Sequence, residues 1–256
     1  MKPLIISLLN TILPNKIKRA LFHLGFNLDK QEFERFAYMY AKAPNMKLGL
    51  IQARNLGLDC RSILDIGAYH GDWSRMAREI WTNSQLTMIE ANTQKQKILK
   101  HVADEIGADL WIELLGAKDD LEVEFYVMES GSSVFEEHSP LDRKRETRTT
   151  RTLDALFPDG TFDFIKIDVQ GYELEVLDGA NNLMQNCTAV LMEISTIEVN
   201  KNCPLLNEVL IYMDKKGFVA YDLMEIHRRP LDNALNQIDF MFVRKDSALI
   251  ENKSHF

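Results

Sequence analysis

From Ile63 onward, short apolar runs alternate along the chain with segments that have the spacing of amphipathic helices. This alternation is typical of strands joined by crossover helices. It therefore predicts an α/β fold in which helices cover both faces of a mostly parallel sheet. The expected strands are 62–65, 85–89, 110–115, 123–128, 162–168, 189–194, 218–223 and 240–243, and the expected helices are 72–80, 93–106, 173–184 and 205–216.

The first expected strand leads into a turn that contains two glycines. Asp65 ends the apolar run, Gly67 and Gly71 follow, and an amphipathic segment begins at Asp72. Glycine lets the backbone approach a ligand closely, and the following helix presents unpaired N–H groups to an anionic group. The turn fits a nucleotide-like cofactor, although an ordinary βα turn with nothing bound would carry the same glycine pair.

The length and composition fit one globular domain with an extension. The chain has 256 residues, of which 46% are hydrophobic, and residues 1–57 show helical spacing but no convincing strand. We expect an N-terminal helical extension over 1–57 and an α/β domain over 58–256. The net charge of −8 argues against a general nucleic-acid binder. Three widely spaced cysteines predict neither a disulfide framework nor a zinc site, and they favour a reducing cytoplasm.

The first 26 residues combine apolar and basic side chains. The apolar stretch 3–13 has no small-residue cleavage pattern, is too short to span a bilayer and runs into Lys16, Lys18 and Arg19. We therefore expect it to belong to the mature protein. Its helices can cap one face of the core. Alternatively, a surface helix within 1–26 can touch a membrane or a lipid-linked substrate, which would make the protein cytoplasmic and peripheral to a membrane.

Several of the expected strands place an acid at or near the carboxyl end, namely Asp65, Glu90, Asp168 and Glu193. In an open α/β sheet these ends line the crevice where ligands bind. Glu90 follows the glycine turn by about twenty residues, where a carboxylate can accept hydrogen bonds from a ribose diol. The three-glycine motif of dinucleotide-binding folds is absent, because only Gly67 and Gly71 are present. The pattern favours an adenosyl ligand without a pyrophosphate.

Several stretches of the sequence carry a resemblance to a known family: Asp65–Gly71, Glu90–Asn92, Ser132–Ser133, Thr152–Asp154 and, most specifically, 165–180 followed by Leu191–Ile194. Over roughly 63–245 the chain resembles the FkbM family of S-adenosylmethionine-dependent methyltransferases. The resemblance implies a Rossmann-like class I methyltransferase fold whose seven-stranded sheet has a final antiparallel strand. It also implies O-methylation of hydroxyls on sugars, glycolipids or related secondary metabolites.

Carried over position by position, the resemblance assigns most of the cofactor site. Asp65, Gly67 and Gly71 would hold the methionine end of S-adenosylmethionine, with Ala68 and Tyr69 between them. The remaining assignments are Glu90 and Ala91 at the ribose, Gly116 and Ala117 beside the adenine, and Asp168 near the transferring methyl. The chain departs from the family at Tyr69, where family members often have asparagine, and at Gln170, where they often have an acid.

An alcohol is a poor nucleophile while it keeps its proton, so a nearby base should accelerate methyl transfer about 10² to 10⁴-fold. Asp168 is the first candidate for this base and Glu193 the second. Asp168 can instead orient the cofactor amine, and Glu193 can instead cap a helix or form a buried ion pair. The other candidates are His70, His138 and His227. No tight ligand spacing indicates a metal site, and we expect no metal requirement.

The acceptor side is predicted to include the polar segment 129–150, with Ser132, Ser133, His138 and Arg143 as its candidate residues. Its basic run from Arg143 to Arg151 is either a solvated face or a mobile loop that admits an anionic or sugar-phosphate acceptor. We expect a small-molecule, sugar or glycolipid acceptor and no nucleic-acid partner. The sequence indicates no oligomeric state. Two other functions are a non-catalytic module that binds S-adenosylmethionine or another adenosine ligand, and a nucleic-acid methyltransferase that uses the basic run.

Overall fold

The computed structural model describes residues 30–254, and two compact units meet at the bond between Ala43 and Pro44. Helix α3, Lys30–Ala41, belongs to the first unit. Helix α4, Met46–Asn55, belongs to the second, where Leu50 and Ala53 are buried against the sheet. The sequence predicts this segment to be part of the extension over 1–57, whereas the packing of α4 joins it to the α/β unit. The proposed membrane contact of residues 1–26 lies outside the described residues.

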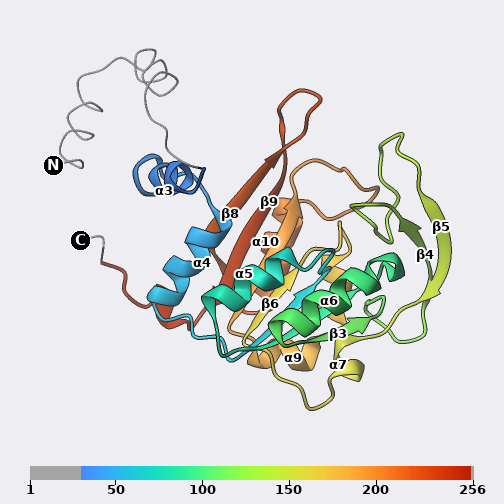
Figure 1. Cartoon of the computed structure of the whole chain (residues 1–256), viewed down its shortest axis with the longest axis horizontal. Helices are drawn as coiled ribbons and strands as arrows, with labels where there is room; N and C mark the ends of the chain where they lie inside the picture. Colours follow the sequence, from blue (N-terminus) through green and yellow to red (C-terminus); the bar gives the residue numbers. More distant parts are fainter. Residues whose placement is uncertain (1–29, 255–256) are drawn as a thin grey trace. The chain divides into compact units, whose positions relative to one another are not determined.

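A seven-stranded sheet organises the second unit, in the order β3-β2-β1-β6-β7-β9-β8 (Figure 1). All neighbouring pairs are parallel except those of β9, which runs antiparallel to both β7 and β8. The seven strands are β1 Ser62–Ile66, β2 Gln85–Glu90, β3 Ala108–Ile112, β6 Phe164–Ile167, β7 Ala189–Ser195, β8 Phe218–Arg228 and β9 Leu235–Arg244. This is the class I methyltransferase sheet with its single antiparallel strand, as the resemblance implied.

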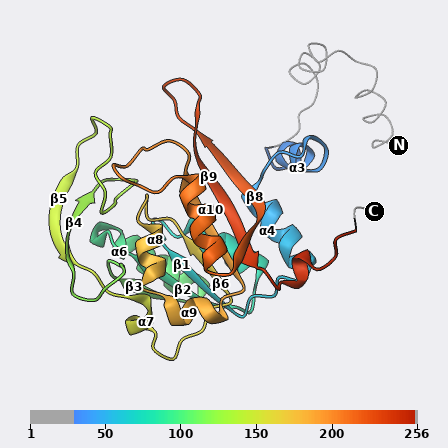
Figure 2. The same cartoon turned by 180° about the vertical axis from the view of Figure 1, so that it is seen from behind.

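Helices cover both faces of the sheet, as the alternation predicts. On one face lie α4, α5 (Asp72–Ile80) and α6 (Gln96–Ile106), the last preceded by the 3-10 turn η1 (Thr93–Lys95). On the other face, turned toward the viewer in Figure 2, lie α7 (Leu153–Leu156), α8 (Glu173–Asp178), α9 (Asn181–Asn186) and α10 (Leu206–Lys215). A short turn, η2 (Ala248–Ile250), follows the last strand.

The central strands are apolar on both faces because helices bury both of them. Along β6, Phe164 packs with α4 and α5, whereas its neighbour Ile165 packs with the helices of the opposite face. Both side chains are fully buried. An unbroken apolar run is therefore what a central parallel strand requires. A charged residue within such a run stands out, and Lys166 of β6 is one.

The structure decides between the two interpretations of the basic run. Residues Lys144–Thr149 form strand β5, which pairs antiparallel with β4 (Glu122–Val127) as a sheet separate from the main one. Most of the run is therefore an exposed or half-exposed strand, as the solvated-face interpretation predicts, and not a loop. Arg145 pairs with Tyr126 in register and forms an ion pair with Glu124, its diagonal neighbour on β4. Threonine and cross-strand charge pairs support an exposed strand of this kind.

Other boundaries also differ from the expected ones. The third strand is 108–112 and not 110–115, and the expected helix 173–184 is two helices separated at Gly179. A Cβ on Gly179 would lie 2.2 Å from the carbonyl oxygen of Gly116, so this glycine lets two backbone segments meet. The last two strands are longer than predicted. Residues 237–239 lie within β9 and not in the connection, because they pair in register with β7.

Within 30–254, no helix is both long and apolar enough to cross a membrane.

Candidate functional site

A cleft opens where β1, β2 and β6 end. It encloses about 790 Å³ including the part that is open to solvent. Its wall includes Gly67, Tyr69, Glu90, Ala91, Asp168, Gln170, Ser132, Ser133 and residues 113–115. Ligands of open α/β sheets bind at this edge. The predicted crevice therefore exists, and it joins segments that lie up to a hundred residues apart.

The glycine turn after β1 is held in a conformation that its sequence makes possible. Gly67 has a φ of +75°, and a Cβ there would lie only 1.8 Å from the carbonyl oxygen of Asp168. Tyr69 also has a positive φ, of 50°. Gly71, with a φ of +79°, precedes α5, and a Cβ there would meet Val102 of α6 at 2.7 Å. Gly67 thus permits contact with the end of β6, and Gly71 permits close packing with α6.

Glu90 connects the end of β2 to this turn. One of its carboxylate oxygens accepts a hydrogen bond from the backbone N–H of Tyr69 at 2.8 Å, and the other accepts one from the N–H of Asn92 at 2.7 Å. Burial raises the pKa of Glu90, and the two backbone hydrogen bonds oppose this change. A carboxylate has about four acceptor positions, so Glu90 can accept further hydrogen bonds from a ligand in the cleft.

Asp65 lies behind the cleft and not in its wall. It is fully buried, accepts a hydrogen bond from the Ser74 hydroxyl at 2.6 Å and lies 3.3 Å from the ammonium of Lys166. Lys166 also donates to the carbonyl oxygen of Gly67 at 3.0 Å and lies 3.5 Å from Asp168. Burial alone would lower the pKa of Lys166, but Asp65 and Asp168 outweigh it and raise the pKa.

Lys166 therefore links the glycine turn to the end of β6. We assigned it no role from the sequence, although an isolated lysine in an apolar strand was the available signal. Breaking a buried charge network leaves an unpaired charge, which typically costs about 3–5 kcal/mol. The contacts of Lys166 with Gly67, Asp65 and Asp168 thus hold the floor of the cleft in place.

Gln170 joins the two predicted catalytic acids. Its side-chain amide donates to Asp168 at 2.9 Å and to Glu193 at 2.6 Å. Gln170 has a φ of +57°, and its backbone carbonyl accepts a hydrogen bond from the Ser133 hydroxyl at 2.8 Å. Burial, with the charges of Asp168 and Asp239, raises the pKa of Glu193 well above its ordinary value. The family's usual acid at this position is thus replaced by an amide that bridges two carboxylates.

Glu173 holds the loop between β6 and α8. Its side chain is buried and accepts hydrogen bonds from the backbone N–H groups of Val169 and Gly171, both at 3.0 Å. Burial raises the pKa of Glu173 to about 7, although these hydrogen bonds oppose the change. The Glu173 carboxylate thus pairs with two backbone N–H groups of this loop that would otherwise lack a hydrogen-bond acceptor.

The residues predicted to bind the cofactor divide into two groups. Those in the cleft wall are Gly67, Tyr69, Glu90, Ala91 and Asp168, whereas Asp65, Ala68, Gly71, Gly116 and Ala117 lie outside it. Gly116 packs against Thr150, which a Cβ would meet at 3.0 Å. Residues 113–115, just before Gly116 in the chain, supply this part of the wall. The cleft wall on this side is therefore formed by residues 113–115 and not by Gly116 and Ala117.

The predicted acceptor residues also divide. Ser132 and Ser133 line the cleft, and the Ser132 hydroxyl accepts a hydrogen bond from the backbone N–H of Met128 at 3.0 Å. His138 and Arg143 lie outside the cleft wall. His138 is 3.4 Å from Glu198, and the guanidinium of Arg143 donates to the carbonyl oxygens of its own loop. These two residues shape the 129–150 segment and do not reach the cleft.

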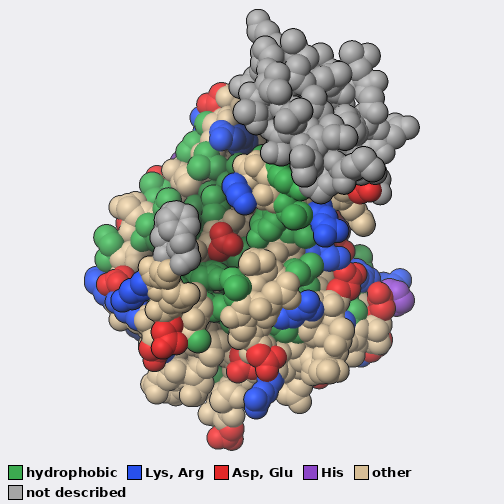
Figure 3. Space-filling view, turned by 90° about the vertical axis from the view of Figure 1, so that its left-hand side faces the viewer, with side chains coloured by type: hydrophobic (Ala, Val, Ile, Leu, Met, Phe, Trp, Pro, Cys, Tyr) green, Lys and Arg blue, Asp and Glu red, His purple; other side chains and the backbone are tan. Residues whose placement is uncertain are grey.

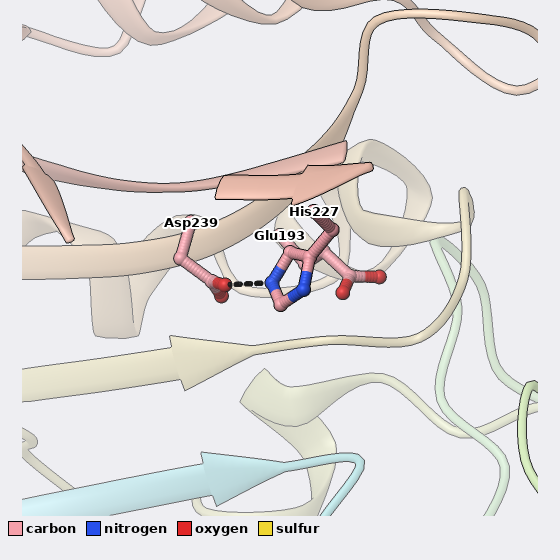
Figure 4. A group of neighbouring side chains, drawn as sticks. All are labelled: Glu193, His227 and Asp239. Carbon is pink, nitrogen blue, oxygen red and sulfur yellow. Dashed lines mark hydrogen bonds and ion pairs between the residues drawn. The ribbon is translucent and has the colours of Figure 1, made fainter. Parts of the chain in front are cut away.

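The three candidate histidines have different surroundings. His70 stacks on Tyr69 and lies 3.2 Å from Lys95, while His138 lies beside Glu198. His227 lies 2.7 Å from Asp239, next to Glu193 (Figure 4). One ligand-type atom from each of these last three residues lies within 4.8 Å of the others. They are the one group in the described chain with such an arrangement, while the expected lack of a metal requirement stays a prediction.

Comparison with known proteins adds a family match. Residues 65–220, more than half of the chain, match the family described as "Methyltransferase FkbM domain". No curated protein sequence matches the chain significantly.

Several solved structures resemble the chain at low identity. The precorrin-6y C5,15-methyltransferase from Geobacter metallireducens GS-15 has 12% identity and a TM-score of 0.44, and the match covers 77% of this chain and 86% of that one. StiE O-MT residues 961–1257 have 11% identity and a TM-score of 0.47, with coverages of 85% and 78%. An O-methyltransferase family protein from Burkholderia thailandensis has 10% identity and a TM-score of 0.44, with coverages of 84% and 59%.

Proposed function

The chain belongs to the FkbM methyltransferase family, and we propose that it is an O-methyltransferase acting on a hydroxyl of a sugar, a glycolipid or a related secondary metabolite. The observation that carries the proposal is the position of Glu90 at the cleft. Its carboxylate is tied to the backbone of the glycine turn at Tyr69 and still faces the space where a ribose would lie. A carboxylate at this position of the fold accepts hydrogen bonds from a ribose diol.

The residues of the cleft fit S-adenosylmethionine. Glu90 retains acceptor positions for the ribose hydroxyls after its two backbone hydrogen bonds. Leu114, Leu115 and Phe125 give the wall beyond Glu90 an apolar surface suited to an adenine ring. Asp168 supplies a carboxylate on the opposite wall that can face the cofactor's cationic groups.

When bound, S-adenosylmethionine supplies a methyl group that is already activated on a positively charged sulfur. The protein therefore has to align the acceptor oxygen, exclude water and remove a proton. Asp168 is held by the Gln170 amide and by Lys166, so its carboxylate has a fixed orientation at the cleft. We propose that it orients the cofactor amine or takes the acceptor's proton. Glu193 keeps a fixed place relative to Asp168 because Gln170 binds both.

We propose that the acceptor enters between the 129–150 segment and the β8–β9 hairpin. Ser132 and Ser133 bring hydroxyl groups to the cleft from the first of these. The sugar and lipid acceptors of the proposal are molecules that such hydroxyls can bind, because each hydroxyl both donates and accepts hydrogen bonds. The segment's cations contribute less directly, since Arg145 pairs with Glu124 and Arg148 donates to the carbonyl oxygen of Ala91.

A nucleic-acid acceptor has less support. The face drawn in Figure 3 carries Lys and Arg interspersed with Asp and Glu, outside the atoms drawn in grey, and not gathered in one basic patch. Binding to a phosphate backbone depends on such a patch. Electrophoretic binding to RNA or DNA at moderate salt would revive this function.

The experiment is methyl transfer from labelled S-adenosylmethionine to a panel of sugars, glycolipids and small hydroxylated metabolites, followed by mass spectrometry. A methyl ether on at least one acceptor is the expected product. The Asp168→Ala variant should lose most of the transfer. Cofactor binding that persists in calorimetry would assign Asp168 to the proton, and weakened binding would assign it to the cofactor amine. Cofactor binding with no turnover on any acceptor would instead favour the non-catalytic module.

We also propose a reducing compartment, the cytoplasm. Cys60, Cys187 and Cys203 are all unpaired and buried, and burial raises the pKa of the Cys187 thiol to about 12. Such thiols behave as small apolar side chains and need no oxidising environment.

A further inference from the structure

A row of polar residues crosses one face of the sheet on the neighbouring strands β7, β9 and β8. Glu193 of β7 pairs in register with Asp239 of β9, and Ser195 pairs with Gln237. His227 of β8 pairs with Gln237, which makes it the diagonal neighbour of Asp239. Directly paired and diagonal residues of neighbouring strands share a face. Glu193, Asp239, Gln237 and His227 therefore project together from three strands.

Two irregularities of β8 flank this row. The pairing of β8 with β9 shifts between Leu223 and Glu225 and again between His227 and Arg228. Such bulges re-aim side chains and are common beside active sites. On the same face of β9, the buried apolar side chain of Met241 follows the acidic Asp239 by two residues. The polar row thus begins where the apolar core of this face ends.

Asp239 determines which ring nitrogen of neutral His227 carries the hydrogen. The Nε2 atom of His227 lies 2.7 Å from a carboxylate oxygen of Asp239. A carboxylate can only accept, so Nε2 carries the hydrogen and Nδ1 of the neutral ring keeps a free lone pair. The His227 side chain is 38% exposed, whereas that of Asp239 is 11% exposed. In Figure 4 the ring lies between the carboxylates of Asp239 and Glu193.

Two amides connect this row to the cofactor cleft. The side-chain amide of Gln237 donates to Glu193 at 2.7 Å, and that of Gln170 donates to the same Glu193 oxygen at 2.6 Å. Gln170 itself lines the cleft and also binds Asp168. Hydrogen bonds therefore connect the cleft to the polar row, from Asp168 through Gln170 and Glu193 to Gln237. Gln237 is the residue that pairs with His227 in the sheet.

We propose that His227 is the base that removes the proton from the acceptor hydroxyl, and that Asp239 is the residue that positions it. The inference rests on the proposed O-methyltransferase function. In the step, the acceptor oxygen forms a bond to the methyl carbon as the bond between that carbon and sulfur breaks. The sulfur keeps the electron pair of the broken bond, and the hydroxyl proton passes to Nδ1 of His227. The positive charge of the sulfonium is thereby replaced by the positive charge of the imidazolium.

His227 is better suited to this role than the two acids. A base works best when its pKa lies near the working pH, and imidazole has an ordinary pKa of about 6.5. The two acids already have partners. Asp168 contacts Gln170 and Lys166. One carboxylate oxygen of Glu193 accepts hydrogen bonds from the amides of Gln170 and Gln237. Nδ1 of His227 has no such partner among the hydrogen bonds of residues 30–254.

The charges around His227 come from four strands. Asp239 of β9 faces Nε2, Glu225 lies on β8 itself, Glu193 lies on β7, and Asp168 follows β6. The hydrogen bond with Asp239 raises the pKa of His227, partial burial opposes this change, and the charges of Asp239, Glu225 and Asp168 add to it. Lys166 of β6 is a buried cation that interacts electrostatically with Asp239. Because the base must be neutral, activity should rise with pH through the pKa of His227.

The first test uses the protein without cofactor. Histidine resonances followed by NMR from pH 5 to 9 should show His227 titrating above the ordinary value near 6.5. The Asp239→Asn variant should shift this midpoint down toward 6.5, because the negative charge beside the ring is removed. An unchanged His227 midpoint in Asp239→Asn would contradict the pairing and overturn the inference.

The second test follows methyl transfer against pH. His227→Asn should lower kcat about 10² to 10⁴-fold, while the dissociation constant of S-adenosylmethionine stays within about twofold. Asp239→Asn should move the acidic limb of the pH profile to lower pH, which a merely structural role would not do. His227→Gln, with a longer amide, repeats the measurement if His227→Asn folds poorly. The matched control is His101→Asn, an exposed residue of helix α6, which should leave the profile unchanged.

Three outcomes would overturn the inference. Full transfer by His227→Asn in a protein that does methylate an acceptor refutes the base and leaves the proposed function intact. A wild-type protein that binds S-adenosylmethionine but methylates nothing refutes the proposed function, and the inference falls with it. Loss of transfer in chelator, restored by Mg²⁺, with Mn²⁺ broadening the His227 resonances, would show that Glu193, His227 and Asp239 hold a divalent cation instead.

Discussion

The two ends of the sheet build their polar sites in different ways. At the cleft, where β1, β2 and β6 end, each important side chain or glycine lies within a few residues of a strand end, as Gly67 and Glu90 do. At the end formed by β7, β9 and β8, the polar row of Glu193, Asp239 and His227 exists only because three strands pair in one register. The first site follows from local sequence, and the second follows from tertiary structure.

This difference fits separate roles for the two regions, one in binding the cofactor and the other in binding the acceptor. The first end supplies a cleft whose shape depends on backbone conformation and on a few buried charges. The second end presents side chains from a long hairpin whose tip, residues 229–234, lies outside the strands. A cofactor common to many methyltransferases suits the first kind of site, and an acceptor that differs between them suits the second. The following substitutions test whether the two ends are separable.

Gly67→Ala should have the largest effect. The new Cβ would lie 1.8 Å from the Asp168 carbonyl oxygen and the residue has a φ of +75°, so the turn would have to move. We expect a loss of at least about 3 kcal/mol in the free energy of unfolding and loss of cofactor binding, measured by urea denaturation and calorimetry. Gly107→Ala is the control, because its φ is +65° but no atom lies within 4 Å of its Cβ. It should cost about 1–2 kcal/mol, and equal losses in the two variants would contradict the close approach.

Glu173→Gln should change the pH dependence of stability. The folded protein holds the Glu173 proton up to about pH 7, whereas the ordinary value is 4.5. The stability from this group is thus complete below about pH 4.5 and declines as the pH rises through 7, by up to about 3 kcal/mol. The variant should be more stable than the wild type at pH 8 and similar to it at pH 4.5. Thermal unfolding at both values measures this, with exposed Glu122→Gln as control; a variant that is less stable at pH 8 would refute the assignment.

Glu90→Gln should weaken cofactor binding without unfolding the protein. Charge-assisted hydrogen bonds contribute about 1.5–3 kcal/mol, so the dissociation constant of S-adenosylmethionine should rise about 10 to 100-fold. Glu193→Gln, at the other end of the sheet, should leave this constant within about twofold. Calorimetric titrations of both variants provide the comparison. Equal weakening by the two substitutions would show that the ends are not separable.

Leu231→Ser should have the smallest effect on the fold. Leu231 is 82% exposed at the tip of the β8–β9 hairpin, so the free energy of unfolding should change by no more than about 0.5 kcal/mol. If the hairpin receives the acceptor, the KM for the acceptor should rise while cofactor affinity stays the same. Steady-state kinetics on an identified acceptor decide this, and an unchanged KM would remove the tip from the acceptor site.

The sequence predicted most of the first end of the sheet. The strand before Gly67, the helix 72–80 and the acid at Glu90 were all located correctly, because each depends on a period or a turn that is local. The fold class followed from the same alternation. Asp65 ends the predicted strand but is buried behind the cleft, since an acid at a strand end can point to either face.

The other end could not be predicted in the same way. Residues 237–239 looked like a polar connection, and only pairing with β7 shows that they are strand. His227 was one of three candidate histidines, and nothing in the sequence placed it beside Asp239, twelve residues further along. The basic run became β5 for a similar reason, since its partner β4 lies about twenty residues away. Register is a tertiary property, and a one-residue slip would send every one of these side chains to the opposite face.

Hydrogen–deuterium exchange of the full chain, with and without S-adenosylmethionine, tests the central claim most directly. If the cofactor occupies the cleft, amides of residues 67–71, 89–92 and 113–115 should become protected, because these segments line it or hold its wall. The β8–β9 hairpin should keep the exchange rate of the free protein. Protection confined to 218–244, or no protection at saturating cofactor, would contradict the assignment of the cofactor to the first end of the sheet.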